Sequence, residues 1–218
     1  MTRKLLSEFI GTLVLVMTVV GSGAMAQNLS QDIGVQLVIN TLSTIFALGI
    51  LIQILGEISG AHFNPVVTLI ALLKKRIDLN SGVLFVIAQF LGGFLGAVIA
   101  NIMFGHPAVF VSTHVRDGWQ LGLSEIIATA FLIFIIEYVV RTERGALAPI
   151  LVPAWIGAAY FFTSSTSFAN PAVTFARGFS NTFSGIAPSS IGGFVAFQVV
   201  GSLLGLLLAS VLIQSKRR

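Results

Sequence analysis

The sequence contains no cysteine and little charge. The absence of Cys from all 218 residues excludes disulfide bonds and thiolate metal sites. Asp, Glu, Lys and Arg together make up 9% of the chain, well below the roughly 25% that is usual in soluble domains. Apolar residues make up 56% and the mean hydropathy is +0.97. The chain is therefore expected to lie in a lipid bilayer.

Six apolar stretches are long enough to cross a bilayer, which takes about 20 residues. They cover residues 5–26, 34–55, 82–103, 119–140, 147–165 and 190–213. These stretches use nearly the whole chain and leave no room for a soluble domain. We therefore predict an all-α membrane protein in which residues 1–218 form a single transmembrane domain.

Most of the basic residues fall on one side of the membrane if the six stretches alternate in direction. That side receives Arg3, Lys4, Lys74, Lys75, Arg76, Arg141, Arg144, Lys216, Arg217 and Arg218. The other side receives Arg116 and Arg177. Since positive residues favour the cytoplasm, both termini are predicted to be cytoplasmic, in a protein that spans the cell membrane several times. The net charge of +4 is attributed to attraction to anionic lipids rather than to a nucleic acid partner.

Two short motifs recur 106 positions apart, namely Asn64-Pro65-Val66-Val67-Thr68 and Asn170-Pro171-Ala172-Val173-Thr174. Asn is a favoured helix N-cap and Pro is favoured at the first helical position. Each motif is therefore expected to begin a short helix, over residues 65–73 and about 171–179. At about 1.5 Å per residue, such a helix crosses roughly half of a 30 Å hydrocarbon core. The two motifs are predicted to form the functional site.

The chain also contains an internal repeat. Ser7-Glu8 begins the first stretch and Ser124-Glu125 begins the fourth, 117 positions later. Each half, 1–115 and 116–218, then has three spans and one Asn-Pro motif. Because three is odd, the halves enter the membrane from opposite sides and form an inverted repeat. Both half-helices are expected to direct their positive N-terminal ends at the midplane.

This arrangement suits small neutral solutes. The side-chain amides of Asn64 and Asn170 can donate hydrogen bonds to a solute, and the backbone before them can offer carbonyl acceptors. The candidate pore-lining residues in these segments are Gly60, Ala61, His62, Phe168 and Ala169. The facing helix dipoles disfavour cations and protons at the centre. No pattern of catalytic, cofactor or metal-ligating residues is present, so an enzyme is not expected.

Both motifs resemble the signatures of the aquaporin and glycerol-facilitator family. The segments are SGAHFNPVVT at residues 59–68 and FANPAVTFAR at residues 168–177. The resemblance covers essentially the whole chain and implies six tilted helices, two half-helices, a homotetramer in the bilayer and passive transport of water or small neutral solutes. It also implies that Glu8 and Glu125 support the re-entrant loops.

Two residues depart from the usual family motifs. Val66 replaces an Ala. The larger Val side chain is expected to repack against a neighbouring span or to narrow the centre of the pore slightly. Val173 stands where family members usually carry the Arg of the outer constriction. Gapless counting by the family spacing assigns the other constriction positions to Thr44, Ala158 and Ser167. This small, uncharged set predicts a wide filter that admits glycerol, urea or neutral metalloid hydroxides such as arsenous acid; the alternative is a water-selective channel.

Several interpretations stay open. Arg177, four residues beyond Val173, is expected either to line the outer vestibule as a displaced filter or to extend toward the lipid headgroups. His62 is expected to hold a local partner, with gating by pH as the alternative. A proton- or sodium-coupled carrier is a further alternative, because such carriers also combine inverted repeats, broken helices and intramembrane acids.

Overall fold

The computed structural model describes residues 1–213, and within them all regular structure is helical. The long helices are α1 (Thr2–Leu29), α2 (Ile33–Ser59), α4 (Leu79–Met103), α5 (Trp119–Arg141), α6 (Ala148–Phe162, preceded by the 3₁₀ turn η1, Gly145–Leu147) and α8 (Pro188–Leu212). The short helices are α3 (Pro65–Leu73) and α7 (Pro171–Arg177). Lys216, Arg217 and Arg218, which contribute to the predicted orientation, lie outside the described residues.

The six predicted spans and the all-α class are confirmed. Six helices within residues 1–213 are long and apolar enough to cross a membrane. The first short helix has the predicted bounds, whereas the second ends at Arg177 and not near 179. The fifth span, α6, ends at Phe162, because residues 163–170 form the turn and loop that lead into the second motif.

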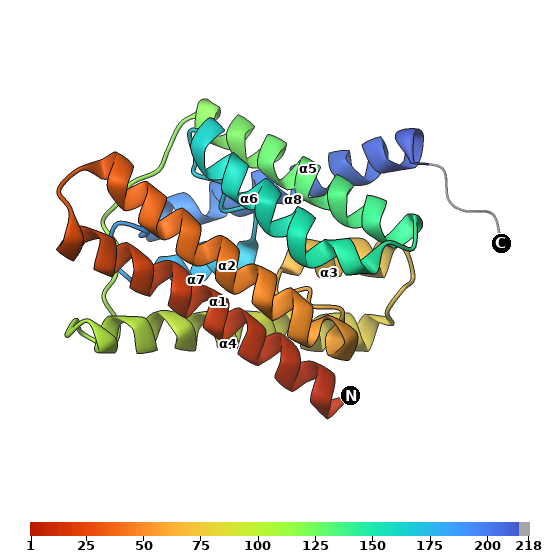
Figure 1. Cartoon of the computed structure of the whole chain (residues 1–218), viewed down its shortest axis with the longest axis horizontal. Helices are drawn as coiled ribbons and strands as arrows, with labels where there is room; N and C mark the ends of the chain where they lie inside the picture. Colours follow the sequence, from red (N-terminus) through yellow and green to blue (C-terminus); the bar gives the residue numbers. More distant parts are fainter. Residues whose placement is uncertain (214–218) are drawn as a thin grey trace.

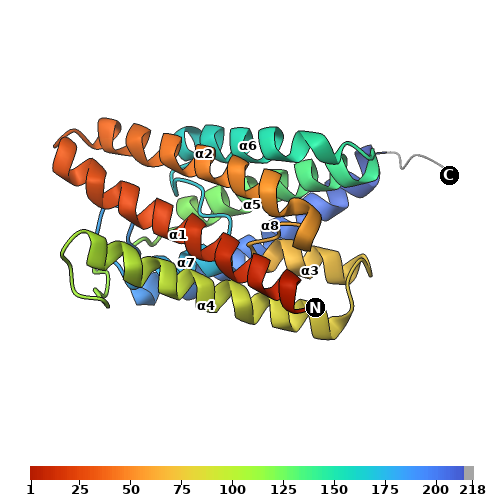
Figure 2. The same ribbon diagram turned by 60° about the horizontal axis from the view of Figure 1, so that its bottom comes forward.

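The long helices run roughly side by side and surround the two short ones (Figure 1). The second view shows the same arrangement, with α3 near one end of the bundle and α7 nearer the other (Figure 2). The N-terminus and the end of α8 lie at the α3 end in both views. The order of elements is the same in each half, with two long helices, a short helix and a further long helix.

Close helix pairs form the frame, with α1 packed on α4 and α5 on α8. Glycines permit the approach at equivalent places. A Cβ at Gly96 would lie 2.3 Å from the Leu13 carbonyl oxygen, and one at Gly205 would lie 2.1 Å from that of Ala130. Neither position has room for a side chain, so small residues set the spacing of these helices.

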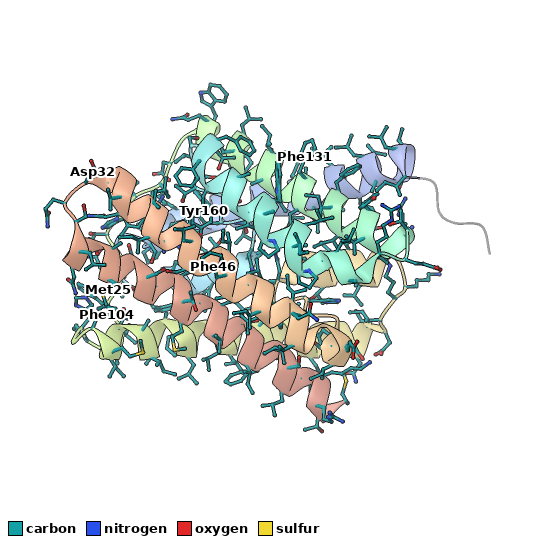
Figure 3. The ribbon with its side chains drawn as sticks, viewed as in Figure 1. Met25, Asp32, Phe46, Phe104, Phe131 and Tyr160 are labelled. Atoms are coloured by element: carbon teal, nitrogen blue, oxygen red, sulfur yellow. The ribbon has the colours of Figure 1, made fainter. Side chains whose placement is uncertain are left out.

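The outward faces of the helices are apolar. Many large hydrophobic side chains are exposed there, including Phe46 on α2 and Phe131 on α5 (Figure 3). The interior contains buried polar side chains, among them Glu8, Gln89, Glu125 and Gln198. An apolar outer surface combined with hydrogen-bonding groups in the interior suits a protein surrounded by lipid.

Candidate functional site

A cavity of about 640 Å³ extends through the bundle beside the two half-helices. Its wall includes residues of α1, α2, α3, α5, α6 and α7 and both loops before the Asn-Pro motifs. The predicted site residues that line it are Thr44, Gly60, Ala61, His62, Asn64, Ser167, Phe168, Ala169, Asn170, Val173 and Arg177. The cavity therefore brings together most of the residues that the sequence singled out.

The tips of the two half-helices meet within this cavity. Asn64 Nδ2 donates to the Ala169 carbonyl and Asn170 Nδ2 donates to the Phe63 carbonyl, each at 2.8 Å. The Asn64 Oδ1 atom accepts from the backbone of Val66 at 3.1 Å, as an N-cap does. An Nδ2 group carries two protons, so each amide retains one donor for a molecule in the cavity.

In each motif the proline and the residue after it pack behind the tip. Val66 and Ala172 are buried, and neither they nor Pro65 and Pro171 line the cavity. Val66 thus fills space between half-helix and scaffold. The prolines begin α3 and α7 and set their direction.

The loops before the motifs have an unusual backbone. Ala61 and Phe63 have positive φ angles of 48° and 47°, and Ser167 and Ala169, at the equivalent positions of the second half, have 50° and 47°. Left-handed backbone is unfavourable for residues with a Cβ and persists only where the surroundings enforce it. All four residues line the cavity, so the left-handed backbone is a feature of the pore wall itself.

Glu8 fixes the backbone conformation of the first loop. Its carboxylate accepts from the backbone N–H of His62 at 3.0 Å and of Phe63 at 2.7 Å. It also accepts from Ser59 Oγ at 2.6 Å and from Gln89 Nε2 at 2.8 Å. Four donors offset the cost of a carboxylate that is completely buried.

Glu125 has the same role in the second loop. It accepts from the backbone N–H of Phe168 and of Ala169, both at 2.9 Å, and from Gln198 Nε2 at 2.7 Å. Gln198 also donates to Thr174 Oγ1 at 2.8 Å, as Gln89 does to Thr68 Oγ1 at 3.0 Å in the first half. These bonds to the backbone amides hold both loops in the conformation in which they line the cavity.

The end of the cavity near α7 contains three of the four predicted filter residues, Thr44, Ser167 and Val173. Ala158, the fourth, requires correction. Its side chain is exposed on the outside of α6, whereas Ile156 and Tyr160 line the cavity. Ile156 and Tyr160 are four residues apart and share one face of the helix, while a residue midway between them points away. The gapless count therefore assigned the wrong face of α6, and this part of the wall is bulkier than predicted.

Arg177 lies at the same end of the cavity. Only 2% of the residue is exposed, so the side chain does not extend toward lipid headgroups. The Nε atom donates to the Ser184 carbonyl, and the guanidinium carbon lies 3.4 Å from the ring centroid of Phe168. Arg116 lies near the same ring, at 5.2 Å. Burial lowers the pKa of Arg116 from its ordinary value, and Glu125 opposes this effect.

The opposite end of the cavity contains an ion cluster that the sequence did not reveal. Glu137 on α5 is fully buried and pairs with Arg76 at 2.5 Å and with Arg141 at 2.9 Å. Arg141 further donates to the Ala209 carbonyl of α8 at 2.8 Å. The cluster joins the end of α3 to α5 and α8. Only the i, i+4 spacing of Glu137 and Arg141 is visible in the sequence, because Arg76 is distant along the chain.

His62 faces the cavity and has a local partner. Its Nδ1 atom lies 3.0 Å from Thr68 Oγ1, and its ring packs edge-on against Phe85. No group of three or more His, Asp or Glu residues within 1–213 is placed to bind a metal ion. The cavity wall is mostly apolar, and the two half-helix tips supply polar groups on one side of it.

This fold and site define a multi-pass membrane channel. A family model described as Major intrinsic protein matches residues 1–169. Aquaglyceroporin AqpS of Rhizobium meliloti (strain 1021) is 45% identical over 217 residues, which cover 100% of this chain and 93% of that protein. Aquaporin TIP1-2 of Musa acuminata is 32% identical and covers 78% of this chain and 72% of its own.

A solved structure shares the fold. The X-ray structure of the aquaglyceroporin from Plasmodium falciparum superposes with a TM-score of 0.70 over 97% of both chains, at 20% sequence identity. Together with the family match and the sequence relatives, this makes the assignment plain. The chain belongs to the major intrinsic protein family, whose members are channels and not enzymes.

Proposed function

We propose that this chain is a passive channel for water and small neutral solutes, with glycerol as the reference solute. The observation that carries the proposal is the pair of hydrogen bonds that joins Asn64 to Ala169 and Asn170 to Phe63 inside the cavity. This arrangement presents amide donors beside carbonyl acceptors, which replace the hydrogen bonds that a hydroxylated molecule makes in water. The two half-helix N-termini disfavour cations at the same point.

The outer constriction supports solutes larger than water. Val173, which lines the cavity, offers no hydrogen bond and leaves room where a long cationic side chain would reduce the opening. Thr44 and Ser167 supply small polar groups on the wall, whereas Ile156 and Tyr160 make another part apolar. Such a mixed wall favours compact neutral molecules such as glycerol, urea and neutral metalloid hydroxides. The name of the similar Rhizobium protein, an aquaglyceroporin, agrees with this choice.

The proposal includes the assembly and the topology. We propose a homotetramer in the cell membrane, with a pore in each subunit and both termini cytoplasmic. We also propose that residues 1–115 and 116–218 are inverted repeats. The paired contacts of Glu8 and Glu125 support this division. Arg3, Lys4 and Arg76, all at the α3 end of the bundle, support the orientation.

Stopped-flow light scattering on proteoliposomes tests the function. Liposomes with the protein should shrink faster than empty liposomes in an impermeant osmolyte. They should then re-swell faster in glycerol, urea or arsenous acid. Fast shrinkage without fast re-swelling would indicate the water-selective alternative. Absence of both, together with solute accumulation driven by a proton or sodium gradient, would indicate a coupled carrier.

A further inference from the structure

The outer end of the cavity contains a buried cation that the proposed filter of Thr44, Ser167 and Val173 does not include. Arg177 is the last residue of α7 and lies one helical turn beyond Val173. Residues four apart share a helix face. Both side chains therefore line the cavity, with Arg177 farther from the meeting point of the two tips.

The guanidinium of Arg177 is held on two sides. The Phe168 ring lies against it, 3.4 Å from ring centroid to guanidinium carbon, and the Ser184 carbonyl accepts from Nε. Phe168 belongs to the loop whose amides Glu125 binds. The side chain is thus fixed by the same framework that shapes the pore.

Arg116, in the segment that precedes α5, binds the same stretch of backbone as Arg177. It donates from Nε to the Gly185 carbonyl at 2.9 Å and from Nη2 to the Phe183 carbonyl at 3.4 Å. Three consecutive carbonyls, at residues 183–185, therefore accept from two arginines. The ion pairs within residues 1–213 involve Arg76 and Arg141, so neither Arg116 nor Arg177 has a carboxylate partner there.

One donor of Arg177 is left unsatisfied. Its Nη1 atom is buried and has no hydrogen-bond partner among the described residues. Buried donors are rarely left unpaired, and a charged one is especially unfavourable. This side chain lines the cavity, so an oxygen atom of a molecule passing through would accept from the guanidinium at Nη2, the terminal nitrogen that is not buried.

We propose that Arg177 provides the charged hydrogen-bond donor of the outer constriction, one helical turn beyond the position that Val173 occupies. This inference rests on the proposed function and deepens it. The filter has two levels, an apolar one at Val173 and a charged one at Arg177. The second level limits the size of the solutes that enter, and the guanidinium donates to their hydroxyl or carbonyl oxygens.

The test compares water shrinkage with re-swelling by glycerol and by erythritol, a longer neutral polyol, in proteoliposomes. Arg177→Gln shortens the side chain and removes the charge. The rate of erythritol re-swelling relative to water shrinkage should rise roughly tenfold, equivalent to about 1.4 kcal/mol in barrier height. Arg177→Lys keeps the charge on a side chain of similar length but lacks the planar guanidinium. Its ratio of erythritol re-swelling to water shrinkage should stay within about twofold of that of the parent.

Arg144→Gln is the matched control. Arg144 is exposed near the opposite end, lies over the Tyr138 ring at 5.8 Å, and does not line the cavity. The control also removes an arginine charge that lies over an aromatic ring, and it should leave the ratio of erythritol re-swelling to water shrinkage unchanged. If Arg177→Gln does not fold, Phe168→Leu frees the guanidinium while retaining it, and should also raise the erythritol ratio.

The outcomes separate this inference from the proposed function. If the parent protein conducts neither water nor glycerol, the proposed function fails. If the parent conducts both and Arg177→Gln leaves the erythritol ratio unchanged, the inference is wrong. A uniform fall in all rates would also overturn it, since that would assign Arg177 to holding residues 183–185 alone.

Discussion

Asn64 donates a hydrogen bond of 2.8 Å to the carbonyl of Ala169, a residue 105 positions away in the other half of the chain. The Asn170 side-chain amide donates an equivalent bond of 2.8 Å to the carbonyl of Phe63. The two half-helices are therefore tied tip to tip, and each amide fixes the loop that precedes the other. A change at one tip should affect both halves of the pore.

Asn64→Asp replaces a donor by a negatively charged acceptor that faces the Ala169 carbonyl. A charged carboxylate at this depth costs about 2–3 kcal/mol or more, and it also cancels the positive potential of the two helix ends. We expect a lower melting temperature in detergent. Stopped-flow scattering should show a loss of water flux per folded protein of about tenfold or more, equivalent to about 1.4 kcal/mol of barrier.

Asn101→Asp is the control for Asn64→Asp. Asn101 is buried and donates to the Phe179 carbonyl at 2.8 Å, outside the cavity. The Asn101→Asp substitution should lower the melting temperature to a similar extent, while the folded protein keeps its water flux. Equal losses of flux in the two variants would show that the effect is not specific to the pore tip.

Glu125→Gln tests the support of the second loop. The carboxylate binds two backbone N–H groups at 2.9 Å, and a carboxamide can accept only with its oxygen. Loss of one charge-assisted bond should destabilise the protein by about 1.5–3 kcal/mol, measured as a lower thermal midpoint. Glu57→Gln, at an exposed position on the cavity wall, should be close to neutral. Equal effects of both substitutions would contradict a supporting role for Glu125.

The sequence predicted the frame of this channel more accurately than its outer wall. Hydropathy indicated the six spans, and Asn followed by Pro indicated where α3 begins, because these signals are local. The ion pair of Glu137 with Arg76 was not predictable, since it depends on how α3 and α5 pack. The same holds for Ala158: a count along the chain ignores helix rotation, and a shift of two residues moves a side chain from the lumen to the lipid.

Ile156→Trp and Ala158→Trp compare the two faces of α6. Ile156 lines the cavity, so a larger ring there should narrow the outer part and reduce glycerol re-swelling by roughly tenfold, or about 1.4 kcal/mol. Ala158 points outward, and the same substitution should leave both water and glycerol rates near those of the parent. The opposite order of effects would restore Ala158 as the constriction residue.

Val173→Arg places a guanidinium at the first level of the outer constriction. Val173 is buried and lines the cavity, so the larger side chain should narrow the opening. We expect the glycerol-to-water ratio to fall roughly tenfold while water passage is retained. Val173→Leu adds bulk without charge and should have a smaller effect. Equal loss of water and glycerol, or no loss of either, would count against Val173 as a filter residue.

Gly205→Ala and Gly193→Ala separate helix packing from helix propensity on α8. A Cβ at Gly205 would lie 2.1 Å from the Ala130 carbonyl oxygen of α5, whereas none of the surrounding atoms lies within 4 Å of one at Gly193. Overpacking at Gly205 should lower stability by about 1–3 kcal/mol. At Gly193 the better helix propensity of Ala should be neutral or should stabilise by up to about 1 kcal/mol. Thermal unfolding in detergent measures both. A tolerated Gly205→Ala would mean that α5 and α8 can separate without loss, and that glycine at this position does not set their spacing.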